Sequence, residues 1–351
     1  MSVKDRILQT LARLRDYARE QGYEIALQYH EEDSYLMRFA NSAISLNTNE
    51  HLIRLQITAY DGKRRASNML ITELDKTDEM KRAIDGTAQM VEHSQPLSYT
   101  PTIPVYGEDF FDESGYDEAL AQLGNQERLA FFNRAVEGLE TDEIRLSGIL
   151  SSGANTMAMT NTRSDHSLYF QTSDAQVTAV LAHQTLKWEV IAEQSAQNAS
   201  DLAPDRLRRE LGFLIERYEI EKPRQLPLGS YDIVFGPAAT AEMISMMNWI
   251  GFDGGLMKRG YSFLAEEQVG QKVFSDRFTL VDDPTRRETY PFKQDFAGMC
   301  REPRPVFQRG VFEGFLWQQD DADEFNAKPT GHTVPHKSLV LREGDRVANT
   351  L

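Results

Sequence analysis

The stretch from Leu52 to Tyr60 constrains the fold most, because its apolar and polar side chains alternate. A period of two places every second side chain on the same face of a β-strand. The stretch ends in Asp61-Gly62, which is typical of β-hairpin turns, so residues 63–70 are predicted to form the return strand. Asn41-Ser42 stands between two apolar runs in residues 34–46 and predicts another hairpin. An antiparallel sheet is therefore expected in the N-terminal part.

The other patterns add helices and strands and predict an α+β fold. Four more strands separated by polar turns are expected at residues 144–150, 156–161, 167–172 and 176–184. Helices are expected near the start of the chain, at residues 78–92, 116–139 and 238–250, and from Pro204 onward. Short strands are expected at residues 231–235, 277–281, 304–308 and 311–317. Residues 94–115 show no clear periodicity and predict a loop.

A linker is predicted at residues 221–228 (EKPRQLPL), which hold two prolines and no periodicity. The length of 351 residues suits about two domains. We predict that residues 1–222 form an N-terminal α/β domain with a mostly antiparallel sheet and flanking helices. Residues 223–351 are expected to form a β-rich C-terminal domain.

The charge balance argues against nucleic acid or an anionic membrane as the main partner. The chain has 54 acidic and 38 basic residues, a formal net charge of −16, so phosphate backbones and anionic lipids would repel it. Its single cysteine, Cys300, excludes an internal disulfide framework and a cysteine-cluster metal site. No apolar run approaches the ~18 residues of a membrane span, and the charged N-terminus is unlike a signal peptide. We therefore expect a cytoplasmic protein.

A search for catalytic or metal-binding motifs finds none that stands on the residues alone. The glycine-rich residues 251–260 follow a predicted helix, whereas a phosphate-binding loop separates a strand from a helix. His332 and His336 are four residues apart, as zinc ligands on a helix would be, but Pro329 and Pro335 make this segment a loop. Ordinary surface histidines are the favoured interpretation of this pair, and a metal site is the alternative.

A series of short motifs, in order along nearly the whole chain, resembles the TldD/PmbA family, also called the TldD/TldE or modulator-of-DNA-gyrase metallopeptidase family. In the N-terminal half, residues 38–41 (RFAN) resemble a family hairpin. Asp295-Phe296-Ala297-Gly298 resembles a D-x-E-G turn in which Ala297 replaces the acid. Further matching segments are residues 236–239 (GPAA), 259–262 (RGYS), 281–284 (VDDP) and 309–316 (RGVFEGFL).

The resemblance implies where a catalytic metal site would lie. Catalytic members of the family are similar to zinc proteases and carry HExxxH on the helix after the Gly-Pro segment. Counting from Gly236 and from Gly260 places the three motif positions on Ser245, Met246 and Ile250, and none of them matches. The family's further metal ligand is a cysteine of its far C-terminal region, and the chain ends at Leu351 before that point, so a shortened C-terminal domain is expected.

The resemblance therefore implies a TldE/PmbA-type subunit without catalytic residues, cofactor or metal of its own. Its partner would be a TldD-type subunit that holds zinc, and together they would degrade or process unfolded or ribosomally made peptides. The alternative is a stand-alone peptide-binding or scaffold homodimer without protease activity. A third interpretation is a hydrolase with a relocated site that includes His332, His336 and nearby acids.

Overall fold

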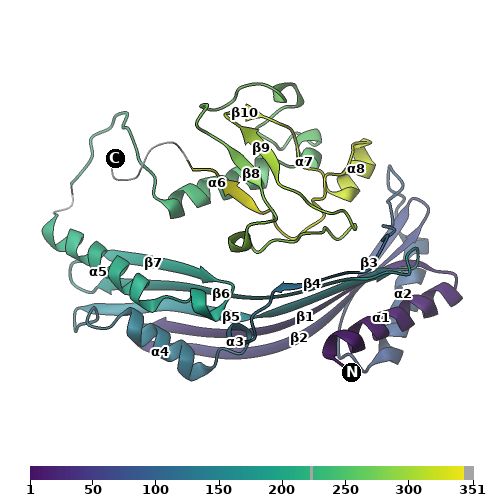
Figure 1. The fold of residues 1–351 in the computed structure, drawn as a ribbon, viewed down its shortest axis with the longest axis horizontal. Helices are drawn as coiled ribbons and strands as arrows, with labels where there is room; N and C mark the ends of the chain where they lie inside the picture. Colours follow the sequence, from purple (N-terminus) through teal and green to yellow (C-terminus); the bar gives the residue numbers. More distant parts are fainter. Residues whose placement is uncertain (222–223, 344–351) are drawn as a thin grey trace.

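The fold is organised around one large, mostly antiparallel sheet. The computed structural model describes residues 1–221 and 224–343 (Figure 1). Two long strands, β1 (Glu24–Ala40) and β2 (Ala43–Asp61), pair along their whole length, and β3 (Arg64–Thr72) returns against β2. The strand order is β3-β2-β1-β5-β6-β4, and β7 also pairs with β6. The predicted α+β class and antiparallel sheet are confirmed.

Both predicted hairpin turns are present. Asn41 and Ser42 join β1 to β2 with φ angles of 51° and 61°, and Gly62 begins the next turn with φ 56°. Positive φ angles match the right-handed twist of the two strands that such a turn joins, and asparagine and glycine adopt them at least cost. The local sequence therefore determines this part of the sheet.

The central strands are longer than the sequence predicted. The strands expected at residues 144–150 and 156–161 are one strand, β5 (Ile144–Asn161), and those expected at 167–172 and 176–184 are one strand, β6 (Leu168–His183). The polar residues inside β5 predicted a turn, but they continue the pairing with β1. The backbones of β5 and β1 come very close at Gly153, which glycine permits because it has no side chain. A Cβ atom there would lie 2.0 Å from the Asp33 carbonyl oxygen.

Two more strands form where none was expected. The predicted loop at residues 94–115 contains β4 (Phe110–Gly115), which pairs in parallel with β6. β7 (Glu189–Ala196) pairs antiparallel with a different part of β6. Conversely, residues 231–235 lie outside any strand, because no neighbouring strand pairs with them. A pairing partner distant in sequence decides the formation of β4, whereas β7 pairs with the strand directly before it in the chain.

The predicted helix at residues 116–139 is interrupted. It forms α3 (Glu118–Ala121) and α4 (Asn125–Ala135), and Gly124 is the N-cap of α4. Asp117 caps α3 by accepting a hydrogen bond from the Leu120 N–H. Capping residues compete with continuation of the helix, so the apolar periodicity alone overestimated its length.

Helices cover one face of the large sheet in two groups. Near one end, α1 (Val3–Glu20) and α2 (Thr77–His93) pack on Ile25 and Tyr29 of β1. Near the other end, α4 and α5 (Pro204–Ile220) pack on Phe39 of the same strand. Because alternate residues of a strand share a face, both groups lie on one side and leave residues 31–35 between them (Figure 1).

The C-terminal part lies over the opposite face of this sheet (Figure 1). Its core is rich in aromatic side chains, including the fully buried Phe252, Phe307 and Phe312. Its helices are α6 (Pro237–Gly251), α7 (Gly254–Lys258) and α8 (Gln319–Phe325). Its sheet has the order β10-β9-β8-β11, formed by β8 (Leu280–Asp282), β9 (Arg304–Gln308), β10 (Val311–Phe312) and β11 (Leu339–Leu341).

Aromatic contacts join the two parts of the chain. Phe292 and Phe296 of the C-terminal part pack on Phe170 of β6, with ring centroids 5.4 and 5.8 Å away. The predicted domain boundary between residues 222 and 223 lies outside the described residues, as does the end of the C-terminal segment. Nothing helical within residues 1–221 or 224–343 is both long and apolar enough to cross a membrane.

Candidate functional site

The helix at which the family metal motif would lie is α6. It begins after the N-cap Gly236 with Pro237, a residue suited to a first turn because it has no N–H to leave unpaired. Ser245 lies in the wall of a cavity. Met246 and Ile250 lie outside that wall, with exposed fractions of 48% and 37%. The three motif positions therefore do not converge on one point.

The chemistry of these three side chains does not fit a hydrolytic zinc ion. Such ions are held by imidazole, carboxylate or thiolate groups, and a carboxylate activates the bound water. A serine hydroxyl, a methionine thioether and an isoleucine hydrocarbon provide neither function. In the described part of the chain, the one group of three histidine, cysteine or acidic side chains close enough to share an ion lies on the large sheet, far from α6 in sequence.

A cavity of about 750 Å³ runs along α6. Ser245 and Asn248 contribute to its wall from α6, and Tyr290, His336 and Lys337 contribute from the facing loops. The side-chain oxygen of Asn248 is buried and has no hydrogen-bond partner among residues 1–221 and 224–343. An unpaired buried acceptor costs free energy, so it favours a ligand that brings an N–H or O–H donor.

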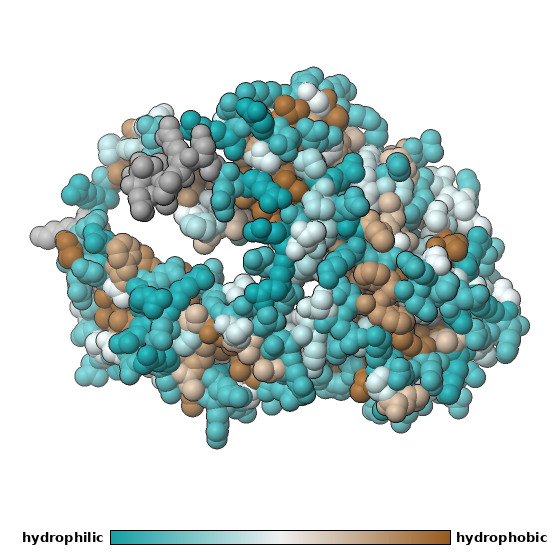
Figure 2. Space-filling view, in the orientation of Figure 1, coloured by the Kyte–Doolittle hydropathy of each residue, from teal (hydrophilic) through white to brown (hydrophobic). Residues whose placement is uncertain are grey.

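A second hollow of about 390 Å³ adjoins this cavity, and both are lined by Tyr290 and His336. Its floor is the face of the large sheet that carries Thr172 and Asp174, and Phe292 forms one side. We call the two hollows together the interdomain groove. Figure 2 shows the molecule deeply hollowed between the sheet and the C-terminal part, on the left of the view.

Tyr290 stands at the junction of the two hollows and has an unusual backbone. Its φ and ψ angles are 51° and 59°, a left-handed conformation that is uncommon for a bulky residue. Its hydroxyl donates a hydrogen bond to the Ala196 carbonyl at 2.9 Å, and its own carbonyl accepts one from His336 Nε2 at 2.7 Å. These two bonds hold the ring in place between β7 and the C-terminal part.

Three ionisable groups of the groove have shifted pKa values. Burial raises the pKa of Asp174, and the nearby carboxylate of Glu32 raises it further. Burial also raises the pKa of Tyr290, to about 12, with added contributions from the Asp174 and Asp201 carboxylates. Across the groove, burial lowers the pKa of Lys337. Perturbed groups in a cleft are characteristic of functional sites, since the same desolvation that shifts them strengthens contacts to a ligand.

The two histidines of the sequence-based metal hypothesis lie in different surroundings. His332 is buried, with Nε2 3.0 Å from Asp282 Oδ2 and Nδ1 2.9 Å from the Thr330 hydroxyl. Both of its ring nitrogens are therefore already engaged. His336 donates to the Tyr290 carbonyl instead, and its ring packs against Phe292 at 5.5 Å. The relocated-hydrolase interpretation gains no support from this arrangement.

Two buried aspartates of the C-terminal part act as internal anchors. Asp282 is fully buried and receives two hydrogen bonds from the Arg301 guanidinium, at 2.7 and 3.0 Å. Asp295 is buried and accepts hydrogen bonds from the backbone N–H groups of Ala297, Met299 and Thr333. These carboxylates hold loops of the C-terminal part.

Sequence reasoning missed the groove residues Tyr290, Asn248 and Asp174. They are single residues in three separate segments, so no spacing rule connects them. The only local signal was the polar Asn248 among the apolar residues of α6.

The comparisons with known proteins match this architecture. A family model described as the PmbA/TldA metallopeptidase C-terminal domain matches residues 228–349. A protein named metalloprotease from Methanothermobacter thermautotrophicus is 27% identical over 106 residues, which are 30% of this chain and 23% of that protein. The chain therefore aligns with less than a quarter of that relative's length.

Solved structures share the fold at low sequence identity. A protein described as a modulator of a DNA gyrase, from Thermotoga maritima, has a TM-score of 0.81 and 16% identity over 97% of this chain and 78% of that chain. TldE from Thermococcus kodakarensis has a TM-score of 0.76 and 16% identity over 98% and 79% of the two chains.

The fold and the C-terminal match together define a metallopeptidase-like protein. The match of residues 228–349 to the family's C-terminal domain and the shared fold support the TldD/PmbA family, as the ordered motifs predicted.

Proposed function

We propose that this chain is the non-catalytic, TldE-type subunit of a complex that degrades or processes unfolded or ribosomally made peptides. The observation that carries the proposal is the chemistry of α6, where Ser245, Met246 and Ile250 stand at the positions of the family's metal ligands and base. A TldD-type subunit would then hold the zinc ion and supply the hydrolytic chemistry.

The interdomain groove supports a role in binding peptide. Ligand sites are typically concave and apolar with a few placed polar groups, and this groove combines aromatic walls at Tyr290 and Phe292 with the unpaired oxygen of Asn248. A peptide backbone carries one N–H donor at each residue other than proline, so it could satisfy that oxygen. The groove would in this way position a chain for cleavage by the partner.

The proposal is tested by measuring hydrolysis of an unstructured peptide by the purified chain, by a TldD-type protein, and by their mixture. We expect no hydrolysis by the chain alone and more by the mixture than by the TldD-type protein alone. Asn248→Leu should reduce this gain, whereas Glu242→Gln, on an exposed part of α6 outside the cavity wall, should leave it unchanged. Chelator-sensitive hydrolysis by the lone chain would contradict the proposal.

The second candidate, a stand-alone peptide-binding or scaffold homodimer, is favoured by the exposed apolar side chains before and along α6. Leu228, Val234 and Trp249 have exposed fractions of 106%, 75% and 69%. Contiguous exposed apolar surface is typical of protein–protein contacts. Light scattering of the chain with and without a TldD-type protein separates the two candidates. A dimer mass that persists unchanged in the mixture would favour the homodimer.

A further inference from the structure

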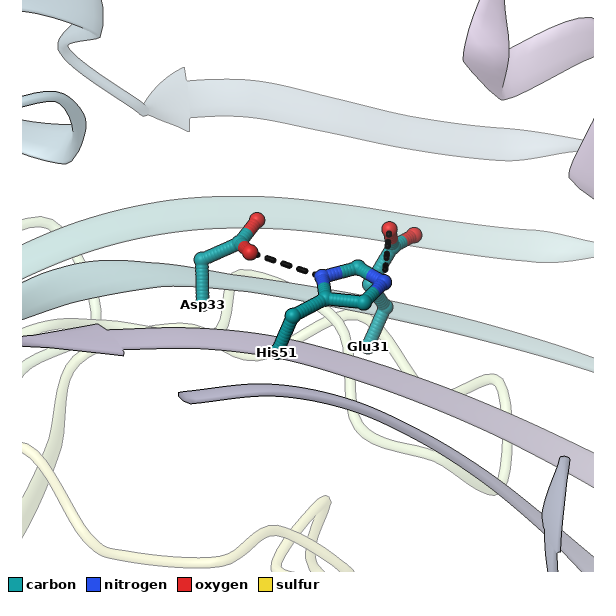
Figure 3. Close-up of side chains that lie close together, drawn as sticks. All are labelled: Glu31, Asp33 and His51. Carbon is teal, nitrogen blue, oxygen red and sulfur yellow. Dashed lines mark hydrogen bonds and ion pairs between the residues drawn. The ribbon is translucent and has the colours of Figure 1, made fainter. Parts of the chain in front are cut away.

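Three side chains with metal-binding chemistry meet on the large sheet, on the face opposite the interdomain groove. Glu31 and Asp33 are two residues apart in β1 and therefore share a face. His51 of β2 is the direct antiparallel partner of Asp33. Figure 3 shows all three side chains rising from the same side of the sheet. They lie between the two helix groups, where the side chains of His51 and Asp33 are 55% and 41% exposed and that of Glu31 is 18% exposed.

The donor atoms are already close to the spacing that a metal ion requires. His51 Nδ1 lies 2.7 Å from Asp33 Oδ1, and His51 Nε2 lies 3.8 Å from Glu31 Oε1. One donor atom from each residue lies within 4.8 Å of the other two. Zinc–ligand bonds of about 2.0–2.2 Å place tetrahedral donor atoms about 3.3–3.6 Å apart. Asp33 and Glu31 face different ring nitrogens of His51, so a single ion would bind one of these nitrogens, and side-chain rotation would bring the other carboxylate to the same ion.

A buried tyrosine orients one of the carboxylates. The Tyr29 hydroxyl donates a hydrogen bond to Glu31 Oε2 at 2.7 Å, and Tyr29 itself is fully buried in the core beneath α1 and α2. This contact fixes the carboxylate and leaves Oε1 directed to His51. A supporting hydrogen bond of this kind, from a rigid group to a ligand's second atom, is characteristic of metal sites.

The local charge favours a cation. Among the described residues, neither Glu31 nor Asp33 has a lysine or arginine ion-pair partner, and His51 is the only basic group paired with them. The nearby cation Lys4 is already paired with Glu113. A divalent ion would compensate this excess of negative charge.

We propose that Glu31, Asp33 and His51 form a binding site for a divalent transition-metal ion, of which Zn²⁺ is the most suitable probe. Each residue would supply one donor atom, and water would complete the coordination. The imidazole nitrogen favours Zn²⁺ over the hard cations Ca²⁺ and Mg²⁺, which prefer oxygen donors throughout. His51 would exchange its hydrogen bond to Asp33 for a bond to the ion.

The test is calorimetric titration of Zn²⁺ into the whole chain after removal of metals with a chelator and dialysis. We expect one saturable site in the wild type and a much weaker response to Ca²⁺. His51→Ala and Asp33→Asn should each weaken Zn²⁺ binding at least about tenfold, because the first removes a donor atom and the second removes a negative charge. His30→Ala is the matched control. His30 lies on β1, as Glu31 and Asp33 do, but on the opposite face of the sheet, where its ring is hydrogen-bonded to Asn155.

Circular dichroism of each variant checks that the sheet remains folded, which we expect because the His51 side chain is 55% exposed. Absence of saturable Zn²⁺ binding in the wild type would overturn the proposal, as would unchanged binding in folded His51→Ala. Either result would identify the cluster as a histidine paired with two carboxylates and nothing more. Hydrolysis by the mixed subunits is a separate readout, so the failure of one proposal leaves the other intact.

Discussion

Replacing Asp282 by asparagine should lower the stability of the protein substantially at neutral pH and much less in acid. Asp282 is fully buried in β8, where it accepts hydrogen bonds from the Arg301 guanidinium, His332 Nε2 and the Ser338 N–H. The substitution Asp282→Asn keeps the shape of the side chain but removes the negative charge. It therefore leaves a buried guanidinium without its counter-ion.

The pKa of Asp282 sets the size of the effect. Burial alone would raise this pKa, but the hydrogen bond from His332 and the positive charge of Arg301 outweigh it and lower the pKa from 3.8 to about 2. A pKa lowered this far corresponds to roughly 2–3 kcal/mol of stabilisation. Because the folded-state pKa lies below the unfolded-state value, this stabilisation is present above about pH 4 and is lost as the pH falls towards 2.

Urea unfolding followed by tryptophan fluorescence at pH 7 and pH 3 measures the effect. At pH 7 we expect Asp282→Asn to lose about 2–4 kcal/mol, which includes the cost of the unpaired arginine. About half of the charge contribution should remain at pH 3. Glu137→Gln is the control, because its ion pair with Arg134 is more than 50% exposed on both sides and should contribute less than about 1 kcal/mol. A loss below about 0.5 kcal/mol at pH 7, or one equally large at pH 3, would refute this reasoning.

Gly310→Ala should lower the free energy of unfolding by about 2 kcal/mol or more, since φ is +79° there and a Cβ would lie 2.2 Å from the Phe274 carbonyl oxygen; an unchanged urea midpoint would contradict this. Asp174→Asn should stabilise the protein at pH 7, because the raised folded-state pKa of Asp174 means that stability falls as the pH rises through its titration. The gain in stability from Asp174→Asn should disappear below the unfolded-state pKa of the aspartate, 3.8. A gain that persists at pH 3 would argue against a charge effect. Arg65 donates to both carboxylate oxygens of Asp320, at 2.6 and 3.1 Å, and joins β3 to α8. A double-mutant cycle should give a coupling of about 0.2–1 kcal/mol for this partly exposed pair, and zero coupling would show that it does not hold the two parts together.

Much of the sheet could be predicted because its signals are local. The alternation from Leu52 to Tyr60 and the turn residues at Asn41 and Gly62 determine β2, its neighbours and their order. The helices expected near the start of the chain, at residues 78–92 and from Pro204 onward are likewise present as α1, α2 and α5. The family followed from many weak motifs in a fixed order, and the same register located Ser245, Met246 and Ile250 on α6.

Other elements could not be predicted because they depend on partners distant in the chain. The parallel pairing of β4 with β6 joins segments more than 50 residues apart, and the continuity of β5 depends on close approach to β1 at Gly153. A polar run that predicts a turn in isolation is compatible with a strand once a neighbouring backbone satisfies its N–H and C=O groups.

The candidate sites likewise combine features that the local sequence determines with features that depend on distant parts of the chain. The sequence by itself determined that α6 carries no zinc-binding motif, because the chemistry of side chains does not depend on their arrangement. Only the tertiary structure decided that Tyr290, Asn248 and Asp174 share a groove, and that His332 and His336 serve separate contacts. It also decided that His51 faces Glu31 and Asp33, since strand register brings together residues that no sequence spacing relates.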